Sequence, residues 1–459
     1  MLDLTGKHVA ILGLGVSGCA AARLCLARGA GVTAFDAKTW DQLSDDAKGL
    51  KTRGVRILAG GDPSEVLKHV DLVVTSPGFP SFPALKASGL RVIGEVELGV
   101  QALPARTPVV AIGGTNGKST TTTLIGAIFE AHGHHPFVGG NLGEPLCDNI
   151  GESFGVAVLE VSSFQLERLE TFKPKVSLLL NVTPDHLDRY PSFEDYARAK
   201  GNAFERQTAD DLAVIPFRDD ICWHQARRGE AVVRTFGPGG DVDVTPKAII
   251  DRSVGHVYPR DEIALVGSHN ALNIAAAIAS VRPFGIPVQT IRDTLRQFRG
   301  LPHRTEYVAE IGGVRFYDDS KGTNVSASVT ALRGLPESKV VLIAGGRGKG
   351  GSYEPLVSVL RSKGHGVVVL GEAAGTIEAA VGDVVPVRRI ALAPASQGDP
   401  SLRLARTMDE VVRAAFAFAQ PGDAVLLSPA CSSLDMFRDY KHRGEEFVSA
   451  VERFAKEQP

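Results

Sequence analysis

Residues 108–120 have the sequence Pro-Val-Val-Ala-Ile-Gly-Gly-Thr-Asn-Gly-Lys-Ser-Thr. An apolar run typical of a buried strand leads into a glycine-rich loop, and a helical pattern begins at about Lys118. Such a loop lets backbone N–H groups converge on phosphate oxygens, and a lysine followed by a hydroxyl suits the β/γ-phosphates and Mg²⁺. Ile112 stands where the generic Walker A pattern has its first glycine. The segment therefore predicts a P-loop-like nucleotide site, with a purely structural glycine turn as the alternative.

The same order of strand, glycine-rich turn and helix opens three groups of elements along the chain. The groups begin with strand-like runs at residues 8–12, 108–112 and 314–317. Other β-rich runs alternate with helical patterns, at 32–35, 55–58, 72–75, 91–93, 156–160, 176–181, 340–344, 366–370 and 424–427. Alternation of this kind is typical of parallel sheets covered by helices, so we predict an α/β fold.

The length of the chain predicts more than one domain. A single core stops growing at roughly 250–300 residues, whereas this chain has 459. We predict a Rossmann-like N-terminal domain at 1–97, a P-loop-type central ATPase domain at 98–300 and a Rossmann-like C-terminal domain at 301–459. The first boundary falls in a polar stretch between prolines, and the second near Gly300-Leu301-Pro302.

Composition narrows the possible partners and the compartment. Apolar residues make up 44% of the chain, charged residues 22%, and the formal net charge is −2, so nothing electrostatic favours a nucleic-acid or membrane partner. The beginning of the chain lacks a signal-peptide pattern, and no apolar run approaches the length of a membrane span. The odd number of cysteines, without C-x-x-C spacing, is typical of reduced thiols: Cys19, Cys25, Cys147, Cys222 and Cys431. We therefore expect a cytoplasmic protein without nucleic-acid or membrane partners. We also expect a monomer, a property that composition does not determine.

Two polar residues follow predicted strands of the central group. Glu160 ends the run at 156–160, and His186 lies shortly after the run at 176–181. In a doubly wound sheet, residues just past the C-terminal strand ends line the ligand crevice. One such residue alone is more often structural, but two beside a P-loop favour a site for the metal that accompanies ATP.

The first group carries a second glycine-rich turn. Gly13-Leu14-Gly15-Val16-Ser17-Gly18 follows a predicted strand, and Asp36 ends the next one. This is the pattern of a dinucleotide fingerprint, which is a weak signal by itself because the same backbone can cradle the diphosphate of any nucleotide. The turn predicts a nucleotide-like ligand and leaves its identity open.

The segment Gly114–Thr120 resembles the ATP loop of the Mur ligase family and of its folylpolyglutamate synthase relatives. Gly113 is a departure, since those proteins usually have threonine or serine there. Further segments resemble the family in the same order along essentially the whole chain, at 159–167, 181–190, 196–200, 269–273, 300–306, 319–324 and 427–444. The resemblance implies an ATP-dependent ligase that forms an amide bond through an acyl phosphate, with the third domain closing over the second to exclude water.

The resemblance also implies roles for individual residues. ATP would be bound by Gly114, Thr115, Asn116, Gly117, Lys118, Ser119, Thr120, Asn270, Asn273, Arg304 and Asp319. Lys118, His186, Lys200 and Lys321 would be catalytic, and Ser119, Glu160, His186 and Lys200 would hold Mg²⁺, with two ions expected. From the residues alone, Asn270 could instead be a helix N-cap, and Asp319 could cap the helix that follows it.

Lys200 is the residue for which composition and resemblance disagree most. It lies on a predicted amphipathic helix, where a lysine is ordinarily a solvent-facing charge. In the family, the matching lysine is carbamylated by CO₂, which converts a cation into an oxygen anion suited to Mg²⁺. The resemblance therefore implies a carbamylated Lys200.

The substrates are implied by the same resemblance. The UDP part of a UDP-muramoyl substrate would contact Gly15, Val16, Ser17, Asp36, Ser76, Pro77, Gly78 and Asn141. The block at 427–444 resembles the family member that adds D-glutamate to UDP-N-acetylmuramoyl-L-alanine in peptidoglycan precursor synthesis. Glutamate would contact Thr323, Lys349, Ser433 and Tyr440. Arg347 stands where an acidic residue is common in the family and Tyr440 where phenylalanine is common, and these departures bear on the acceptor amino acid rather than on the reaction class.

Three alternatives remain open from the sequence. An NAD(P)-dependent dehydrogenase would use Gly13–Gly18 and Asp36 but would leave the P-loop unexplained. A non-catalytic nucleotide-binding regulator conflicts with the intact Lys118, Glu160 and Lys200. A sibling ligase that adds another amino acid, for example L-glutamate, fits the same motifs, since the sequence does not decide D- against L-stereospecificity.

Overall fold

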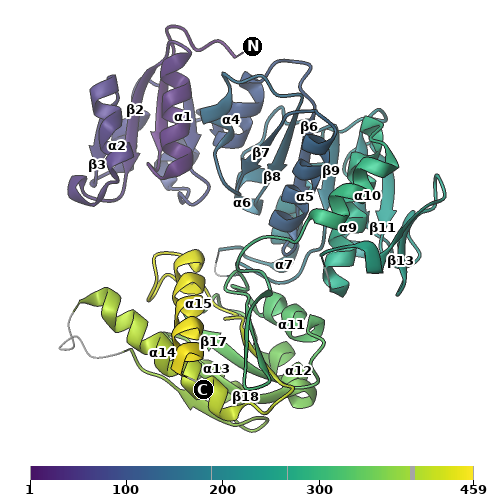
Figure 1. Ribbon diagram of the computed structural model, residues 1–459. Helices are drawn as coiled ribbons and strands as arrows, with labels where there is room; N and C mark the ends of the chain where they lie inside the picture. Colours follow the sequence, from purple (N-terminus) through teal and green to yellow (C-terminus); the bar gives the residue numbers. More distant parts are fainter. Residues whose placement is uncertain (1, 188, 266, 393–398, 458–459) are drawn as a thin grey trace. The chain divides into compact units, whose positions relative to one another are not determined.

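The computed structural model describes residues 2–187, 189–265, 267–392 and 399–457. Over these residues the strands form three sheets with helices packed against them, as Figure 1 shows. The chain divides into two compact units. The first comprises residues through Val182, Glu194–Ala264 and Ala271–Phe298, and the second comprises Thr183–Phe193, Leu265–Asn270 and the chain from Arg299 onward. The predicted boundaries near residues 97 and 300 stay predictions.

The first sheet is parallel and has the order β3-β2-β1-β4-β5. Its strands are β1 (His8–Leu12), β2 (Gly31–Asp36), β3 (Arg56–Ala59), β4 (Leu72–Thr75) and β5 (Val92–Gly94), and its helices are α1 (Val16–Ala27), α2 (Asp45–Gly49), α3 (Pro83–Ala87) and α4 (Glu95–Ala102). The strand order reverses beside β1, so the carboxyl end of β1 is where a doubly wound sheet opens a ligand crevice. α4 joins two cores, since Leu98 packs in the core of this sheet and Val96 in the core of the next.

The second sheet has nine strands in the order β14-β13-β12-β11-β10-β9-β6-β8-β7. They are β6 (Val109–Gly113), β7 (Pro136–Gly140), β8 (Val156–Glu160), β9 (Val176–Leu179), β10 (Leu212–Pro216), β11 (Val232–Phe236), β12 (Val242–Val244), β13 (Ala248–Asp251) and β14 (His256–Pro259). The helices of this stretch are α5 (Lys118–Ala131), α6 (Ser163–Leu166), α7 (Phe193–Gly201), α8 (Asp220–Ala226), α9 (Ser268–Val281) and α10 (Val288–Gln297). Pairing is parallel from β7 to β12, and β12, β13 and β14 add an antiparallel extension.

The third sheet has the order β15-β16-β20-β17-β18-β19. Its strands are β15 (Glu306–Ile311), β16 (Val314–Asp318), β17 (Val340–Gly345), β18 (Gly364–Leu370), β19 (Val387–Arg389) and β20 (Ala424–Leu427), and its helices are α11 (Val325–Gly334), α12 (Glu354–Lys363), α13 (Ala374–Val381), α14 (Pro400–Phe418) and α15 (Tyr440–Glu457). One core packs α11, α12 and α13 against the sheet, and another packs α14 and α15. Only β15 is antiparallel to its neighbour.

The predicted α/β fold is confirmed, and the ends of each predicted strand, including the run at 176–181, lie within two residues of those of an observed strand. The expectation of parallel sheets is incomplete, because β12–β14 and β15 pair in the antiparallel sense. Among the described residues, no helix is both long enough and apolar enough to cross a membrane.

Candidate functional site

The loop between β6 and α5 is shaped by glycines. Gly114 has a φ of 141° and Gly117 a φ of 86°, conformations that favour glycine. A Cβ on Gly117 would lie 2.4 Å from Oδ1 of Asn273, so this position also has no room for a side chain. The Lys118 ammonium folds back over the loop and donates to the carbonyl oxygens of Gly114 at 2.9 Å and Thr115 at 3.0 Å. The arrangement concentrates positive charge at the start of a helix, as phosphate binding requires.

Asn181, which follows β9, fixes the middle of this loop. Its carbonyl oxygen accepts from the N–H of Thr115 at 3.0 Å, and its Oδ1 accepts from the N–H of Asn116 at 2.9 Å. Its Nδ2 donates to the carbonyl of Asn116 at 3.1 Å. Sequence reasoning gave Asn181 no role, although its place at the end of the predicted run 176–181 was a signal that it could face the loop.

The predicted metal ligands of the first unit lie close to the P-loop. Ser119 and Glu160 are both 2% exposed, and Ile112 of β6 pairs with Glu160 of β8, so the carboxylate emerges beside the loop. Asn141 donates to Oε1 of Glu160 at 2.7 Å from its amide group and to the Glu160 carbonyl at 2.9 Å from its backbone. A serine hydroxyl and a carboxylate are oxygen donors of the kind Mg²⁺ prefers, so this corner fits the ion chemically. Asn141, predicted to contact the UDP substrate, contacts this carboxylate instead of the N-terminal turn.

Lys200 is 3% exposed, so the solvent-facing position that composition suggests is wrong. Its ammonium donates to the Gly114 carbonyl at 2.7 Å and lies 4.6 Å from the ring centroid of Tyr196. The Tyr196 hydroxyl in turn lies 3.1 Å from the hydroxyl of Thr115. The ammonium groups of Lys118 and Lys200 therefore share one carbonyl oxygen of the P-loop.

A cavity of about 640 Å³ lies at the carboxyl end of β1. Asp36 closes the glycine turn, because its carboxylate accepts from the N–H of Leu14 at 2.7 Å and of Lys38 at 2.9 Å. The ring of Phe79 packs edge-on against Phe35 and Phe82 and supplies an apolar wall that sequence reasoning did not identify. Seven of the eight residues predicted to contact the UDP part line this cavity: Gly15, Val16, Ser17, Asp36, Ser76, Pro77 and Gly78.

Asp319 is the centre of a polar network in the second unit. It accepts from the Ser428 hydroxyl at 2.6 Å and from the N–H of Thr305 at 3.1 Å. Burial raises the pKa of its carboxyl to about 7, opposed by the Ser428 hydrogen bond and by the nearby Arg304. The capping alternative for Asp319 is wrong, because Asn324 caps α11 through the N–H of Ala327. Capping by Asn270 is wrong as well, since α9 begins at Ser268 and includes it.

Asp185 contacts Lys349 of the predicted amino-acid site and Asn324, which follows Thr323 in the chain. Its carboxylate lies 3.7 Å from the Lys349 ammonium and accepts from Nδ2 of Asn324 at 3.2 Å. Its neighbour His186 has a φ of 55° and a ring nitrogen 3.8 Å from the same carboxylate. The contact between Asp185 and Lys349 is consistent with the predicted role of Lys349, which is to bind a carboxylate of glutamate.

Two loops that carry predicted glutamate contacts pair with each other. The backbone groups of Arg347 and Ser432 exchange two hydrogen bonds of 2.9 Å, which sets the Lys349 loop beside the buried Ser433.

The Arg347 guanidinium, one of the departures from the family pattern, pairs with Glu372 at 3.0 Å on the surface. The ring of Tyr440, the other departure, lies 3.9 Å from the Lys321 ammonium. Thr323 follows Lys321 in the same turn and donates its N–H to the Lys321 carbonyl.

Arg443 is a buried residue of α15 to which sequence reasoning gave no role. Its guanidinium donates to the hydroxyl of Ser320 at 3.0 Å, to the Ser320 carbonyl at 2.8 Å and to the Cys431 carbonyl at 3.3 Å. Burial lowers its pKa to about 10. Arg443 thus ties the turn that carries Lys321 to the loop that carries Ser433.

The predicted site residues form two groups, one in each compact unit. The first unit holds the P-loop residues Gly114–Thr120, with Glu160, Lys200, Asn273, Asn141 and the N-terminal cavity. The second unit holds His186, Asn270, Arg304, Asp319, Lys321, Thr323, Lys349, Ser433 and Tyr440. The placement of His186 beside the metal ligands of the first unit therefore stays a prediction.

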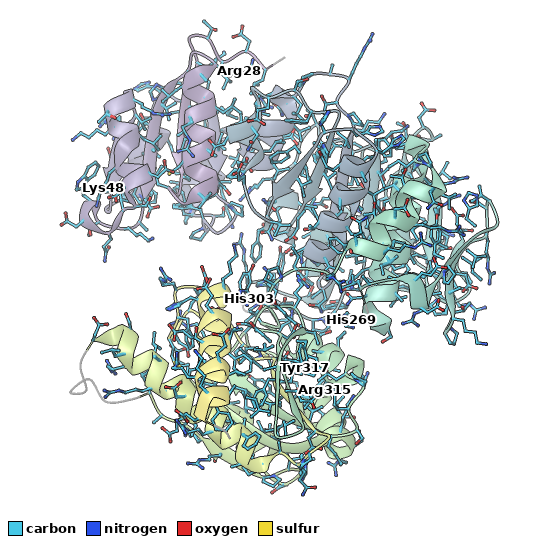
Figure 2. The ribbon with its side chains drawn as sticks, in the orientation of Figure 1. Arg28, Lys48, His269, His303, Arg315 and Tyr317 are labelled. Atoms are coloured by element: carbon cyan, nitrogen blue, oxygen red, sulfur yellow. The ribbon has the colours of Figure 1, made fainter. Side chains whose placement is uncertain are left out.

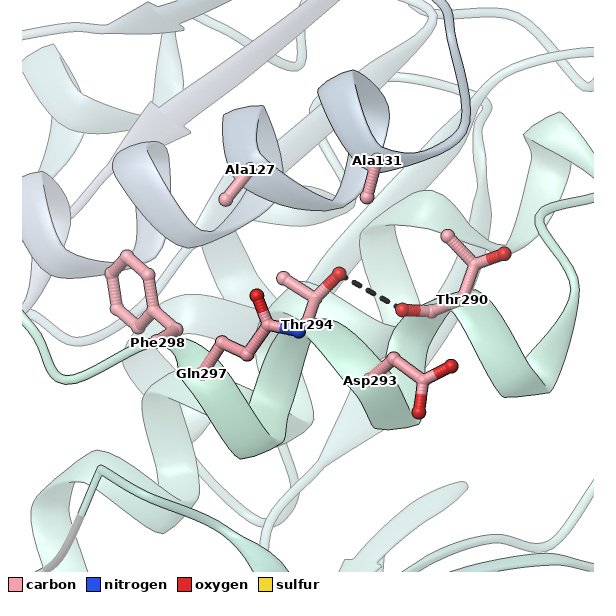
Figure 3. Close-up of a pocket in the computed structure, with 7 residues that line it drawn as sticks. All are labelled: Ala127, Ala131, Thr290, Asp293, Thr294, Gln297 and Phe298. Carbon is pink, nitrogen blue, oxygen red and sulfur yellow. Dashed lines mark hydrogen bonds between the residues drawn. The ribbon is translucent and has the colours of Figure 1, made fainter.

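Another cavity, of about 440 Å³, lies between α5 and α10 (Figure 3). It is lined by Ala127, Ala131, Thr290, Asp293, Thr294, Gln297 and Phe298, and contains none of the predicted site residues. The Asp293 carboxylate already pairs with Arg296 at 3.1 Å and accepts from Gln289 at 2.9 Å. We assign no ligand to this cavity.

Comparison with known proteins agrees with this arrangement. The MurD-like N-terminal domain of Mur ligases matches residues 7–94, the Mur ligase middle domain matches 112–281, and the Mur ligase glutamate ligase domain matches 303–431. A protein of Acidobacterium capsulatum named UDP-N-acetylmuramoylalanine–D-glutamate ligase is 40% identical over 98% of this chain and 97% of its own length. The chain belongs to the Mur ligase family. A Geotalea daltonii protein of the same name is also 40% identical to this Mur ligase, over 99% of both chains.

Solved structures with low sequence identity share the fold of this Mur ligase. A pseudomurein peptide ligase type C from Methanothermus fervidus has a TM-score of 0.60 at 17% identity, covering 98% of this chain and 100% of its own. MurF ligase from Thermotoga maritima, solved in complex with ADP, has a TM-score of 0.59 at 19% identity, covering 99% and 96%. The three-domain α/β organisation predicted from the sequence is thus that of the family, whose members use ATP.

Proposed function

We propose that this Mur ligase is a UDP-N-acetylmuramoylalanine–D-glutamate ligase of peptidoglycan precursor synthesis. The reaction would use ATP to join the amine of D-glutamate to the alanine carboxylate of UDP-N-acetylmuramoyl-L-alanine. Full-length relatives at 40% identity carry this name. The structural observation that carries the proposal is the P-loop with Lys118 and Ser119, which has Glu160 of β8 beside it and the buried Lys200 bonded to its Gly114 carbonyl.

The chemistry follows from the leaving group. A carboxylate cannot form an amide directly, because the departing group would be oxide, so phosphorylation by ATP must come first. Phosphoryl transfer needs mainly positioning and charge neutralisation. Lys118 of the P-loop and Lys321 of the second unit are the cations we assign to the developing charge. The amine of glutamate then attacks the acyl carbon, and a tetrahedral intermediate expels phosphate.

We propose that Ser119, Glu160 and a carbamylated Lys200 hold Mg²⁺, with His186 near a second ion. Bound Mg²⁺ would neutralise phosphate charge and polarise the transferred group. The shared Gly114 carbonyl supports the modification, because two ammonium groups directed at one oxygen repel each other. In carbamylation the Lys200 ammonium first loses a proton, and the neutral amine then joins CO₂ and loses a second proton, leaving an anion in place of one cation.

The remaining assignments follow the two groups of residues. The N-terminal cavity would hold the UDP part, with its polar glycine turn against the diphosphate and its Phe79 wall against the base. Asn270, Asn273, Arg304 and Asp319 would contact the nucleoside and phosphates of ATP. Lys349, Thr323, Ser433 and Tyr440 would bind glutamate, whose carboxylate would replace the Asp185 carboxylate beside Lys349. We also propose that the enzyme acts in the cytoplasm as a monomer.

A substrate panel tests the function. Phosphate release would be measured with ATP, Mg²⁺, UDP-N-acetylmuramoyl-L-alanine and D-glutamate, L-glutamate, L-alanine or diaminopimelate in turn. Of the four amino acids, we expect only D-glutamate to support turnover. The product should have the summed mass of UDP-N-acetylmuramoyl-L-alanine and D-glutamate less one water. Turnover that prefers L-glutamate would support the sibling ligase instead. Calorimetry that finds tight NAD binding and no UDP-muramoyl binding would favour the dehydrogenase alternative.

A further inference from the structure

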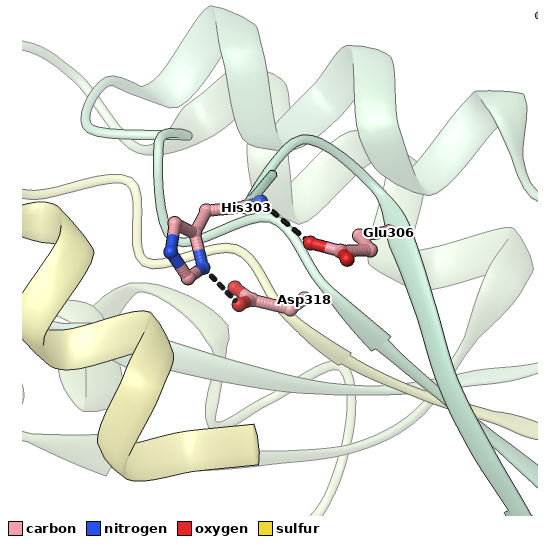
Figure 4. Close-up of side chains that lie close together, drawn as sticks. All are labelled: His303, Glu306 and Asp318. Carbon is pink, nitrogen blue, oxygen red and sulfur yellow. Dashed lines mark hydrogen bonds and ion pairs between the residues drawn. The ribbon is translucent and has the colours of Figure 1, made fainter. Parts of the chain in front are cut away.

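His303 and Asp318 form a closed pair in the second unit, shown in Figure 4. Nδ1 of His303 lies 2.6 Å from Oδ2 of Asp318, whose side chain is fully buried. His303, also labelled in Figure 2, precedes β15, and Asp318 ends β16. A Cβ on Gly444 would lie 2.3 Å from His303 Nδ1 and 2.8 Å from Asp318 Oδ2, so α15 covers the pair at a position without a side chain.

The pair holds both ends of the turn that carries Lys321. Oδ1 of Asp318 accepts from the N–H of Ser320 at 2.8 Å, and the carbonyl of His303 accepts from the N–H of Lys321 at 3.1 Å. Two residues later, the N–H of Thr305 donates to Asp319. The loop before β15 and the turn after β16 are therefore joined by two backbone-donated hydrogen bonds and by the His303–Asp318 pair, while the Ser320 bond closes the turn on itself.

The backbone of this loop is in an unusual conformation. His303 has a φ of 62° and Thr305 a φ of 48°, in the left-handed region that a β-branched residue rarely adopts. Backbone conformations of this kind persist only where surrounding contacts hold them, and they are concentrated at functional sites. The contacts of His303 with Asp318 and Lys321 restrain the loop before Arg304, and the bond from Thr305 to Asp319 restrains it after Arg304.

We propose that His303, acting through Asp318, is a positioning residue that fixes the turn carrying Lys321 for the phosphoryl-transfer step. This inference rests on the proposed function. In this assignment His303 contacts no reacting atom. It fixes the backbone of Lys321, and thereby the position from which the Lys321 side chain extends. The Tyr440 ring supports both residues, since it lies 6.5 Å from the His303 ring centroid and 3.9 Å from the Lys321 ammonium.

The charge state of His303 should govern this restraint. The hydrogen bond to Asp318 raises the pKa of the imidazole, burial opposes this, and Glu306 and Glu445 add to the increase. Among the described residues, the charged or titratable groups around the pair come from its own loop, β15, β16, the following turn and α15: Arg304, Glu306, Asp318, Asp319, Lys321, Tyr440, Arg443 and Glu445. Below this raised pKa, His303 is an imidazolium that forms an ion pair with the Asp318 carboxylate. Above it, His303 is neutral and the ion pair is lost, so the restraint on the Lys321 turn weakens as the pH rises.

A metal ion is not needed to explain why these residues are close together. Donor atoms of His303, Glu306 and Asp318 all lie within 4.8 Å of one another. However, Nδ1 of His303 is bonded to Asp318, and the Glu306 carboxylate accepts from the N–H of His303 at 2.8 Å. These two bonds account for the grouping.

The test compares H303N and H303A with a matched control, H365N. His365 forms the same kind of pair with Asp423 at 2.5 Å, but Asp423 precedes β20, at the opposite end of the sheet from the carboxyl end of β16. Asparagine retains an amide donor near the position of Nδ1 and tolerates a positive φ, whereas alanine retains neither. For each variant, kcat and each KM would be measured between pH 6 and 10.

We expect H303A to lower kcat at least about tenfold while each KM changes less than about threefold. H303N should recover part of that loss and should lack the fall in kcat that the wild type shows as the pH rises. H365N should match the wild type within about twofold at every pH. If H303A does not fold, H303N decides. The positioning role is wrong if H303N reproduces the wild-type kcat at every pH, or if the loss lies in KM alone.

Hydrogen exchange at the Lys321 amide gives a readout that does not depend on turnover. That amide donates to the His303 carbonyl, so its exchange should be at least about tenfold faster in H303N than in H365N. Equal exchange would overturn the inference even in an active enzyme. A wild type without ligase activity but with this exchange difference would contradict the proposed function and leave the contact between His303 and the Lys321 turn intact.

Discussion

Replacing Glu95 with glutamine should remove a pH-dependent loss of stability. Glu95 begins α4, the helix that joins the cores of the first two sheets, and is 1% exposed. Its Oε1 accepts from the N–H of Cys147 at 2.8 Å, and its Oε2 has no hydrogen-bond partner among the described residues. Burial raises the pKa of this carboxyl from 4.5 to about 7.

The size and sign of the effect follow from the two pKa values. In the unfolded chain Glu95 ionises near its ordinary pKa of 4.5, whereas in the folded chain it stays protonated until about pH 7. The folded state therefore binds more protons between these values, and stability falls as the pH rises through that window. Each pH unit is worth about 1.4 kcal/mol, so the loss approaches ~3 kcal/mol above pH 7.

The assay is urea unfolding of the wild type, Glu95→Gln and the exposed control Glu130→Gln at pH 5 and pH 8. Glutamine keeps an acceptor for the Cys147 N–H but does not ionise. The unfolding free energy of Glu95→Gln minus that of the wild type should be about 2–3 kcal/mol larger at pH 8 than at pH 5. The control should follow the wild type. An equal difference between Glu95→Gln and the wild type at both pH values would refute the argument.

Three further predictions concern the P-loop. Gly117→Ala forces a side chain against Asn273 at a φ of 86°, so calorimetry should show ATP affinity reduced at least about tenfold in a folded protein; unchanged affinity would contradict the loop geometry. Lys118→Ala should lower kcat/KM at least about 10³-fold, because a main charge stabiliser is lost; near-normal turnover would contradict the ATP assignment. Lys200→Ala should lose most activity but keep ATP binding, and added acetate should restore part of the rate; a fully active variant would rule out the carbamate ligand.

The elements that the sequence predicted best are those whose signal is local. The run at 156–160 is continuous, apolar and ended by a carboxylate, and β8 has these bounds. The P-loop was predicted equally well, because a strand, glycines and a lysine follow one another within a few residues. By contrast, β12 has three residues with Asp243 at its centre, and its pairing with β13 is set by contacts that no short pattern records.

Burial was the main property that the sequence could not supply. Lys200 lies on a helix with a polar composition, where the ordinary expectation is exposure, and only the resemblance suggested otherwise. Its burial depends on Tyr196 and on Gly114, which is 86 residues away along the chain. Asn181 was missed for a related reason, since an asparagine after a strand could contact solvent as well as the loop.

Three buried ionisable groups of the second unit lie at or beside a single turn. Asp318, Asp319 and Arg443 are all at most 7% exposed, and each bonds to the Asp318–Lys321 segment or lies in it. Burying a charged side chain costs free energy that burying an apolar side chain does not. The presence of these three groups is therefore better explained by their positioning the turn than by their stabilising the fold. The partners come from distant segments, because Arg443 is 123 residues from Ser320 and Ser428 is 109 residues from Asp319. Contacts from several distant parts of the chain therefore restrain the turn that carries Lys321, which a short local motif could not do.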